Sequence, residues 1–482
     1  MRSHTTPRRA LVALGVAIGS FAILQSLLVP VLPLMQRDLR TDAPGITWAL
    51  TLYLIVAAVA TPLAGRAGDL LGKRRVLLAA LAAVGLGSLV AAVAPNLPVL
   101  LTGRALQGLG GAMIPLAFGL VRDVLPAERV AGGVGALAAI IAVGSGLGTV
   151  LAGPLSGAIG WRGLFVLPLA GVVVGGWLVL RAVPDGAAAA RGRLNAVAGV
   201  LLSAWLLALL LPLSSGESWG WGSARTVGLL VAAGVLAAAW VVVELRAREP
   251  LVDVRMMRLP GVWNTNVAAV LIGAAMYGVW AYFARFLQEP TSTGYGLGAG
   301  VGTAGLLMLP MLALMAAAGF ATGPLGRVLA PRAQLAGGSA LIAVATAAIA
   351  LFHRSAPLLS AEAAVFGLGL GVAFAAMTTI VVTSVPADRT GVASGMNTNL
   401  RTIGSAVGTA LTTAIVTGSA TAPGGEPTEH GYTVGFLVLA VVAALAAVVA
   451  VASRASRGGS DAGVASLPAT EALEEVAVGS AA

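Results

Sequence analysis

The chain has 482 residues, of which 58% are apolar and only 10% are charged, and its mean hydropathy is +0.94. Because soluble domains carry about 25% charged residues, this composition excludes an ordinary soluble protein and indicates an integral membrane protein made of helices. There is no cysteine and there are three scattered histidines, so we expect no disulfide, no metal and no cofactor. The net charge of +10 is spread over many short loops, which argues against nucleic acid as a partner.

The N-terminus superficially resembles a signal peptide, with Arg2, Arg8 and Arg9 before an apolar run that reaches Leu34. The run is too long and lacks a cleavage site, so we interpret it as an uncleaved first span. Fourteen apolar segments are predicted to cross a bilayer, at about residues 11–34, 47–64, 76–94, 98–121, 131–158, 163–182, 194–213, 224–244, 262–287, 299–320, 334–352, 358–382, 391–417 and 432–452.

Basic residues set the predicted orientation. Of the 29 lysines and arginines, 21 fall in segments on the side of the N-terminus, six in loops on the other side and two inside spans. The positive-inside rule therefore places both termini in the cytoplasm, and we expect a multi-pass protein of the cell membrane. The predicted units are a tail over 1–10, a six-helix bundle over 11–182, a two-helix insertion over 183–261, a second six-helix bundle over 262–452 and a disordered tail over 453–482.

The fourth segment contains Arg104 and Gln107, which lie three residues apart and so share one helix face. A charge in a spanning helix costs at least about 2.5–3.5 kcal/mol on insertion scales, which makes Arg104 a functional candidate. The alternative is an arginine that snorkels to the outer interface. The neighbouring glycines Gly108, Gly110 and Gly111 favour a packed, polar-lined position.

The thirteenth segment is also polar, because it carries Asn397, Asn399 and Arg401. These side chains need internal partners in a bilayer, so they either clamp neighbouring helices or contact the cargo or a proton. Embedded acids are scarce, so proton coupling would have to use Glu362 near the start of the twelfth span, Asp69, Asp123 or a carboxylate on the substrate.

The sequence repeats at a shift of about 260 residues. Leu125-Pro-Ala-Glu-Arg129 matches Val385-Pro-Ala-Asp-Arg389. Parallel repeats predict two six-helix halves around a central cavity that rock against each other. We expect the repeated small residues to set the interface between the halves, namely Gly135, Gly144, Gly148 and Thr149 in the first half and Gly395, Gly404, Gly408 and Thr409 in the second.

The segment after the second span reads Gly65-Arg-Ala-Gly-Asp-Leu-Leu-Gly-Lys-Arg-Arg75. It is not a P-loop, because the spacing from Gly68 is one residue short and no Ser or Thr follows the lysine. Gly65 and Gly72 permit a tight turn, and Asp69 can cap a neighbouring helix or pair with an arginine. We expect three basic residues to hold this loop at the inner surface of the membrane, namely Lys73, Arg74 and Arg75.

This segment resembles the signature loop of the major facilitator superfamily. The resemblance implies that Asp69 latches the cytoplasmic gate, with Arg122 or Arg129 as candidate partners. The stretch from Arg104 to Ala112 is similar to the family's fourth-helix motif, in which the arginine is associated with proton coupling. Together with fourteen spans, this resemblance points to the 14-spanner drug:proton antiporter branch.

Two positions depart from that branch. Gln25 stands in the first helix where an acid is common, and the motif of the fifth helix has Thr149 and Ala152 in place of a proline and a glycine. With Gln25 there, Arg104 has no embedded carboxylate nearby, and we expect it to contact Gln107, backbone carbonyls, water or the cargo.

The resemblance implies an all-α membrane protein with the major facilitator fold, formed by two six-helix bundles plus two extra transmembrane helices. It also implies a secondary transporter that exports amphiphilic small organic molecules in exchange for protons. Two embedded arginines argue against a permanently cationic cargo. The expected partners are a small-molecule substrate, protons and the lipid bilayer, and we expect a monomer.

Two alternatives remain. One is a facilitator or exporter of an anionic or neutral metabolite without proton antiport. The other is a protein that does not transport, either a receptor or a membrane enzyme. The sequence offers neither a soluble output domain nor a convergent cluster of acid, base and nucleophile, so we predict that the protein is not an enzyme.

Overall fold

A computed structural model describes residues 7–28, 31–41, 43–184, 195–248, 250–252, 254–257, 259–386, 389–419 and 427–452. Across these ranges the chain forms helices joined by turns, without a strand. The predicted disorder of the tail over 453–482 lies outside the described residues.

The chain begins with α1 (Pro7–Ser26), α2 (Leu32–Asp38), α3 (Ala43–Leu71) and α4 (Lys73–Ala92). The first predicted span, 11–34, is therefore too long, because α1 ends at Ser26 and a separate short helix begins at Leu32. The second predicted span ended at residue 64, but α3 continues to Leu71. The turn before α4 is Gly72, whose φ of 99° favours glycine.

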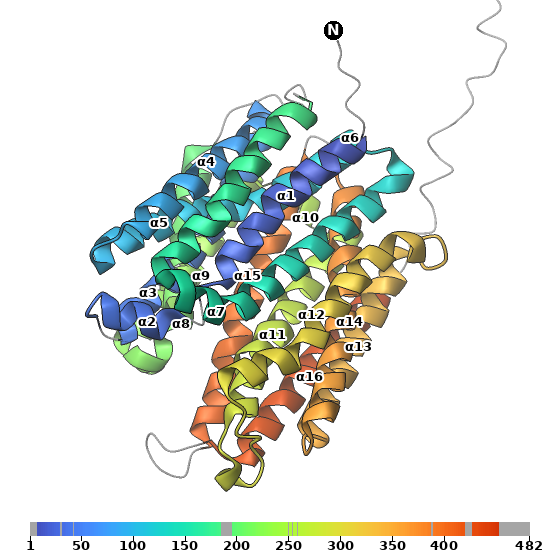
Figure 1. Ribbon diagram of the computed structural model, residues 1–482. Coiled ribbons are helices and arrows are strands. Elements are labelled where there is room, and N and C mark those ends of the chain that lie inside the picture. The colour runs from blue at the N-terminus through green and yellow to red at the C-terminus, as the bar shows by residue number, and fades with distance from the viewer. Residues whose placement is uncertain are drawn as a thin grey trace, which may run out of the picture.

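The fourth predicted span is interrupted. It consists of α5 (Leu97–Gly108), a 3-10 turn η2 (Leu109–Ala112) and α6 (Met113–Val124). Predicted spans five and six form one element, α7 (Ala127–Ala182), which is broken at Gly160 with a φ of 68°. The chain reverses direction there (Figure 1), so the sequence correctly separated the two spans.

The predicted insertion contains α8 (Ala196–Trp219), α9 (Ala224–Arg246) and the short α10 (Val254–Met257). Trp205 of α8 and Trp240 of α9 pack with ring centroids 6.0 Å apart. The pair joins a hydrophobic cluster with Val392 and Met396 of the second half. The opposite face of α9 is exposed, with Val235 64% accessible, as expected for a lipid-facing helix.

The rest of the chain forms α11 (Pro260–Gln288), the 3-10 turn η3 (Thr291–Thr293), α12 (Val301–Leu325), α13 (Pro331–Leu351), α14 (Ala356–Ser384), α15 (Thr390–Gly418) and α16 (Glu429–Ala452). One large hydrophobic cluster lies almost wholly within residues 10–183 and a second almost wholly within 268–450. Each half therefore has its own core. The two groups of helices diverge away from the end where the N-terminus lies (Figure 1).

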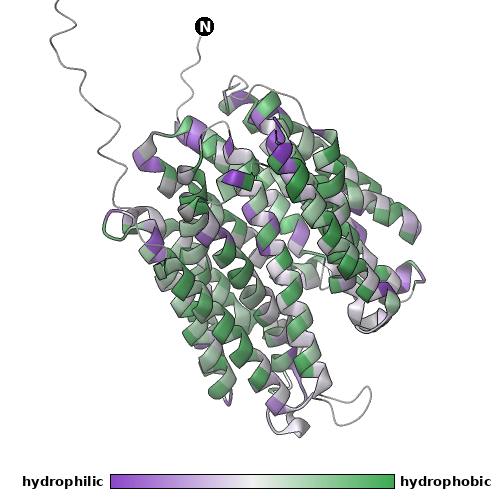
Figure 2. Cartoon of the chain, turned by 180° about the vertical axis from the view of Figure 1, so that it is seen from behind, coloured by the Kyte–Doolittle hydropathy of each residue, from purple (hydrophilic) through white to green (hydrophobic). Residues whose placement is uncertain are grey.

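Thirteen segments of the described residues are long and apolar enough to cross a membrane. Hydrophobic residues cover the length of these helices, whereas hydrophilic residues gather near the end that carries the N-terminus (Figure 2). The 29-residue α15 is long enough to cross but is more polar than the others. With α15 the arrangement is consistent with fourteen spans.

Candidate transport and gating sites

Arg104 lies inside the first half, with 1% of its surface accessible. Its Nε donates to the Ala49 carbonyl of α3 at 2.8 Å, and its two terminal nitrogens donate to Gln107 Oε1 at 2.5 Å and to Gln25 Oε1 at 3.2 Å. The guanidinium also stacks over the Tyr53 ring at 4.5 Å. The arginine is therefore satisfied within one bundle, and the snorkelling alternative is wrong.

The network continues through Gln107, whose Nε2 donates to Ser88 Oγ of α4 at 2.9 Å. The 3-10 turn that follows fits a crowded junction. A Cβ on Gly110 would lie 2.7 Å from the Phe21 ring, and one on Gly111 would lie 2.7 Å from Ala57. Glycine at these positions lets the helix approach α1 and α3 closely, which brings Arg104 next to Gln25.

Three polar residues of α15 have separate partners. Asn397 Nδ2 donates to Asn266 Oδ1 of α11 at 2.9 Å, within the second half. Asn399 Nδ2 donates to the Ala58 carbonyl of α3 at 2.7 Å and so links the two halves. The side chain of Arg401 is only partly buried and stacks over Phe374 of α14 at 4.8 Å. In this conformation both asparagines bind neighbouring helices, whereas the Arg401 guanidinium is partly open to other partners.

Glu362 lies at the far end of the second half, about 9 Å along α14 at 1.5 Å per residue. It is 7% accessible, and its Oε2 is buried without a hydrogen-bond partner among the described residues. His353 lies close enough to interact with it electrostatically. The imidazole Nε2 is 2.8 Å from Glu429 Oε1, and Glu429 is exposed. A histidine thus lies near a buried carboxyl and is paired with a second, exposed carboxyl.

Asp69 joins the two halves at the end where the N-terminus lies, which we call the basic end. Its carboxylate accepts hydrogen bonds from the backbone N–H groups of Gly391 at 3.4 Å and Val392 at 3.3 Å. These groups open α15, so Asp69 caps the start of a helix from the other half. Gly65 permits this approach, because a Cβ there would lie 2.7 Å from the Gly391 carbonyl.

The basic residues after Gly72 hold the first half together. Lys73 Nζ pairs with Asp123 Oδ2 at 2.8 Å, and Arg74 donates to the Leu180 carbonyl at 2.6 Å. Arg75 is exposed. Arg122 crosses to the other half and donates to the Val385 carbonyl at 2.7 Å, and it does not pair with Asp69. Asp69 and Arg122 therefore make two separate contacts between the halves.

The repeated glycines divide into two groups. A Cβ on Gly148 would lie 2.6 Å from the Ile23 carbonyl of α1, and Gly144 also packs on α1. In the second half Gly404 and Gly408 pack on α11 in the same way. We expected these four glycines to set the contact between the halves, and this is wrong. Gly144 and Gly148 pack on α1 of their own first half, and Gly404 and Gly408 pack on α11 of their own second half. The side chain of Thr149 lies outside the described residues, and Thr409 is partly buried.

The contact between halves is made at the other pair of glycines. A Cβ on Gly135 would overlap the Gly319 carbonyl of α12, and one on Gly395 would lie 3.2 Å from the Thr61 carbonyl of α3. The pairs α7–α12 and α15–α3 are therefore equivalent contacts in the two repeats. Close backbone packing at both supports a basic end that is closed.

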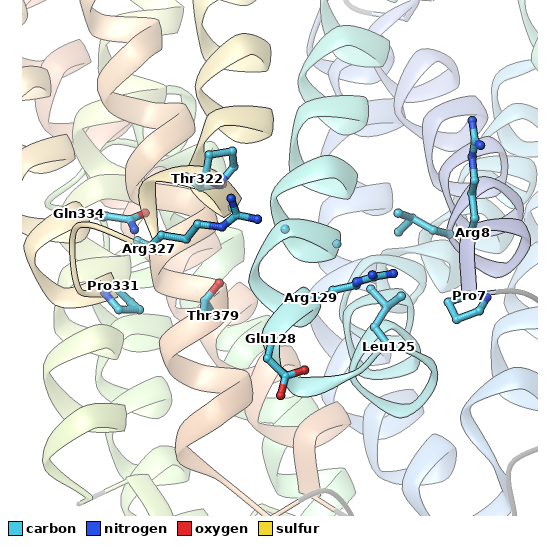
Figure 3. A pocket seen from close by; sticks show the side chains of 17 residues that line it. Pro7, Arg8, Leu125, Glu128, Arg129, Thr322, Arg327, Pro331, Gln334 and Thr379 are labelled. Carbon is cyan, nitrogen blue, oxygen red and sulfur yellow. The ribbon is translucent and has the colours of Figure 1, made fainter.

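A cavity of about 550 Å³ opens beside this closed end. It is lined by the start of α1 and α7 from the first half and by the end of α12, the start of α13 and part of α14 from the second. Figure 3 shows Arg327 reaching from the turn after α12 toward α7, while Arg129 extends from α7 on the side of α1.

A family model described as Major Facilitator Superfamily matches residues 14–409. The chain belongs to the Major Facilitator Superfamily. The match covers the first half, the insertion and the second half as far as residue 409, so the predicted fold class and the predicted family are confirmed. This is a family of transporters and not of enzymes, which excludes the enzyme alternative.

Several curated relatives of this superfamily are similar in sequence. The Multidrug resistance protein Stp of Mycobacterium tuberculosis is 31% identical over 409 residues, covering 83% of this chain and 74% of Stp. The Tetracenomycin C resistance and export protein of Streptomyces glaucescens is 26% identical over 83% of this chain and 74% of its own. The Probable actinorhodin transporter of Streptomyces coelicolor is 29% identical over 81% of this chain and 70% of its own.

A solved structure supports the fold independently. The human organic anion transporter MFSD10 superposes with a TM-score of 0.69, covering 92% of this chain and 99% of its own, at 16% identity. At that identity the likeness concerns the fold alone. The chain is therefore a multi-pass membrane transporter of small molecules with the major facilitator fold.

Some partners could not be found from the sequence. Ser88, Tyr53 and Asn266 complete the networks of Arg104 and Asn397, but they come from helices distant in sequence. His353, in the turn after α13, is one of the three histidines for which the sequence suggested no role, although it is 8% accessible and paired with Glu429. Its position after a long apolar helix and before Glu362 was the available signal.

Proposed function

We propose that the protein is a proton-coupled exporter of amphiphilic small organic molecules. It works as a monomer in the cell membrane with both termini in the cytoplasm, by rocking the two halves around a central site. The basic end is then the cytoplasmic end. The conformation described above corresponds to the outward-facing state, since Asp69, Arg122 and Gly135 hold the cytoplasmic end closed.

The observation that carries proton coupling is the buried Oε2 of Glu362, which has no partner among the described residues. Burying a carboxylate oxygen without a hydrogen-bond partner costs free energy, which protonation relieves. Since Glu429 is exposed and His353 lies between the two carboxyls, protons reach Glu362 from the outside. Proton release toward the cytoplasm follows when the halves rock.

The cargo preference is supported by charge. Arg104 and Arg401 carry positive charge inside the helical region, and neither has a carboxylate within salt-bridge distance among the described residues. Such an interior favours neutral or anionic amphiphiles over permanent cations. Relatives named for multidrug resistance, tetracenomycin C and actinorhodin support export of organic molecules as the general activity.

The test is transport in proteoliposomes with an imposed pH gradient, screened with anionic, neutral and cationic amphiphiles. We expect gradient-driven accumulation by the unaltered protein and its loss in Glu362→Gln, which still exchanges labelled for unlabelled cargo across the membrane. Glu289→Gln is the matched control, since Glu289 is a buried acid of the same end that already accepts a hydrogen bond from Tyr432.

Two results would contradict the proposal. Transport that does not depend on the pH gradient for any compound would favour the facilitator alternative. The neutral Gln25 in the first helix is the observation that supports that alternative. Normal gradient coupling in Glu362→Gln would remove this residue from the proton path.

A further inference from the structure

The cavity beside the closed basic end has an unbalanced charge. Three arginines line it, Arg8 from α1, Arg129 from α7 and Arg327 from the turn after α12, against one acid, Glu128. None of the three arginines has an ion pair or a hydrogen bond through its side chain to a described residue. Each guanidinium offers five N–H donors, so the cavity presents donors for an anion without acceptors to satisfy them.

Other basic residues at the basic end, in contrast, have bonding partners. Lys73 pairs with Asp123, Arg74 binds the Leu180 carbonyl and Arg122 binds the Val385 carbonyl. These residues have a structural role that accounts for their charge. The three cavity arginines have no such structural role among the described residues. They come from both halves and from segments far apart in sequence (Figure 3).

The position and the walls of the cavity identify the kind of anion. Most of the lining residues lie near the ends of α1, α7, α12 and α13, at the end of the molecule where hydrophilic residues gather. Leu11, Leu125 and Ala376 give the cavity apolar wall, and the hydroxyl-bearing Thr379 adds a polar group from α14. A basic pocket between transmembrane helices with apolar walls suits a phosphate that carries an acyl chain.

We propose that this cavity binds the phosphate headgroup of an anionic phospholipid. Both halves line the cavity, so a headgroup in it lies near Arg327 of the second half and near Arg129 and Arg8 of the first, which line it on different sides of α7 (Figure 3). Because one headgroup then contacts both halves, the bound lipid stabilises the conformation with the basic end closed. Rocking the halves apart moves Arg327 away from Arg129 and weakens the site. The inference concerns lipid binding and does not depend on proton coupling or on the identity of the cargo.

Lipid retention tests the site directly. The purified protein is mixed with phosphatidylglycerol or phosphatidylcholine and examined by native mass spectrometry. We expect preferential retention of phosphatidylglycerol, and a loss of that preference by at least roughly tenfold in Arg129→Gln/Arg327→Gln. Arg246→Gln is the matched control, because Arg246 ends α9 at the basic end and lies outside the cavity.

A second readout measures the conformation. Spin-label distances across the basic end, in vesicles with and without phosphatidylglycerol, should report a larger closed population with the anionic lipid. The double variant should not respond. Equal retention of phosphatidylglycerol by the double variant and the unaltered protein would overturn the proposal. Equal stabilisation by inorganic phosphate would overturn the lipid assignment and leave a soluble-anion site, whatever the transport assays give.

Discussion

Asp69 at the end of α3 accepts a hydrogen bond from the backbone N–H of Val392, the third residue of α15, over 3.3 Å. The contact joins residues more than 320 positions apart in sequence and links the two halves at the basic end. It places a negative charge at the positive end of a helix. The hydrogen bonds of Asp69 to the other half are therefore made to a helix start, while Arg122 binds a different carbonyl of that half.

Asp69→Asn should weaken these hydrogen bonds. The amide keeps the shape but removes the charge, and a charge at a helix N-terminus contributes about 0.3–1 kcal/mol. The closed population of the basic end should fall by about twofold to fivefold, measured by spin-label distances between the ends of α6 and α14. Asp123→Asn is the control, because its partner Lys73 belongs to the same half. A comparable shift in that variant would contradict a latch specific to Asp69.

Gly135→Ala and Gly408→Ala should have different effects, one on conformation and the other on stability. Either Cβ would overlap a backbone carbonyl, of Gly319 and of Ala274 respectively. The Gly135 contact lies between halves, so opening of the basic end relieves it, and we expect a conformational shift with little loss of thermal stability. The Gly408 contact lies within one half, so we expect unfolding to become easier by about 1–3 kcal/mol. Thermal denaturation together with spin-label distances distinguishes the two effects. The prediction fails if both variants lose stability equally.

Arg104→Ala should reduce stability as well as transport. The substitution leaves Gln25, Gln107 and the Ala49 carbonyl without their donor inside the first half, and unsatisfied buried groups cost about 1–3 kcal/mol each. We expect a lower melting temperature and proportionally lower transport. Arg225→Ala removes an exposed arginine that also stacks on a tryptophan, Trp219, and should change stability by less than about 0.5 kcal/mol. Transport lost at unchanged stability would instead indicate direct contact with cargo or proton.

Arg401→Gln should change the charge preference of transport. Arg401 is partly buried, stacks over Phe374 and has no carboxylate partner among the described residues, so its charge is available to a cargo. We expect the apparent affinity for anionic amphiphiles to fall about tenfold while that for neutral compounds is retained. Competition assays with matched anionic and neutral compounds measure this. Arg354→Gln at the exposed far end serves as control, and an equal loss for both classes would indicate a structural role.

Much of the fold follows from local sequence. Long apolar runs predicted the helices, and matched glycines predicted equivalent contacts in two repeats. Element ends were less predictable: we expected a tight turn at Gly65, but α3 continues through it to Leu71 and the turn comes at Gly72 alone. The site shows the same limit. Gln107 was expected beside Arg104, being three residues away, but Ser88 and the Ala49 carbonyl depend on how the helices pack.

Among the described helices long enough to cross a bilayer, α15 is the most polar, so we expect it to insert less readily by itself. Its polar side chains have partners on helices made earlier in synthesis, with Asn399 on the Ala58 carbonyl and Asn397 on Asn266. Entry of α15 into the bilayer during biogenesis is thus conditional on α3 and α11 already being there to receive it. Damage to α3 in the first half should then appear as misinsertion of a helix synthesised some 300 residues later.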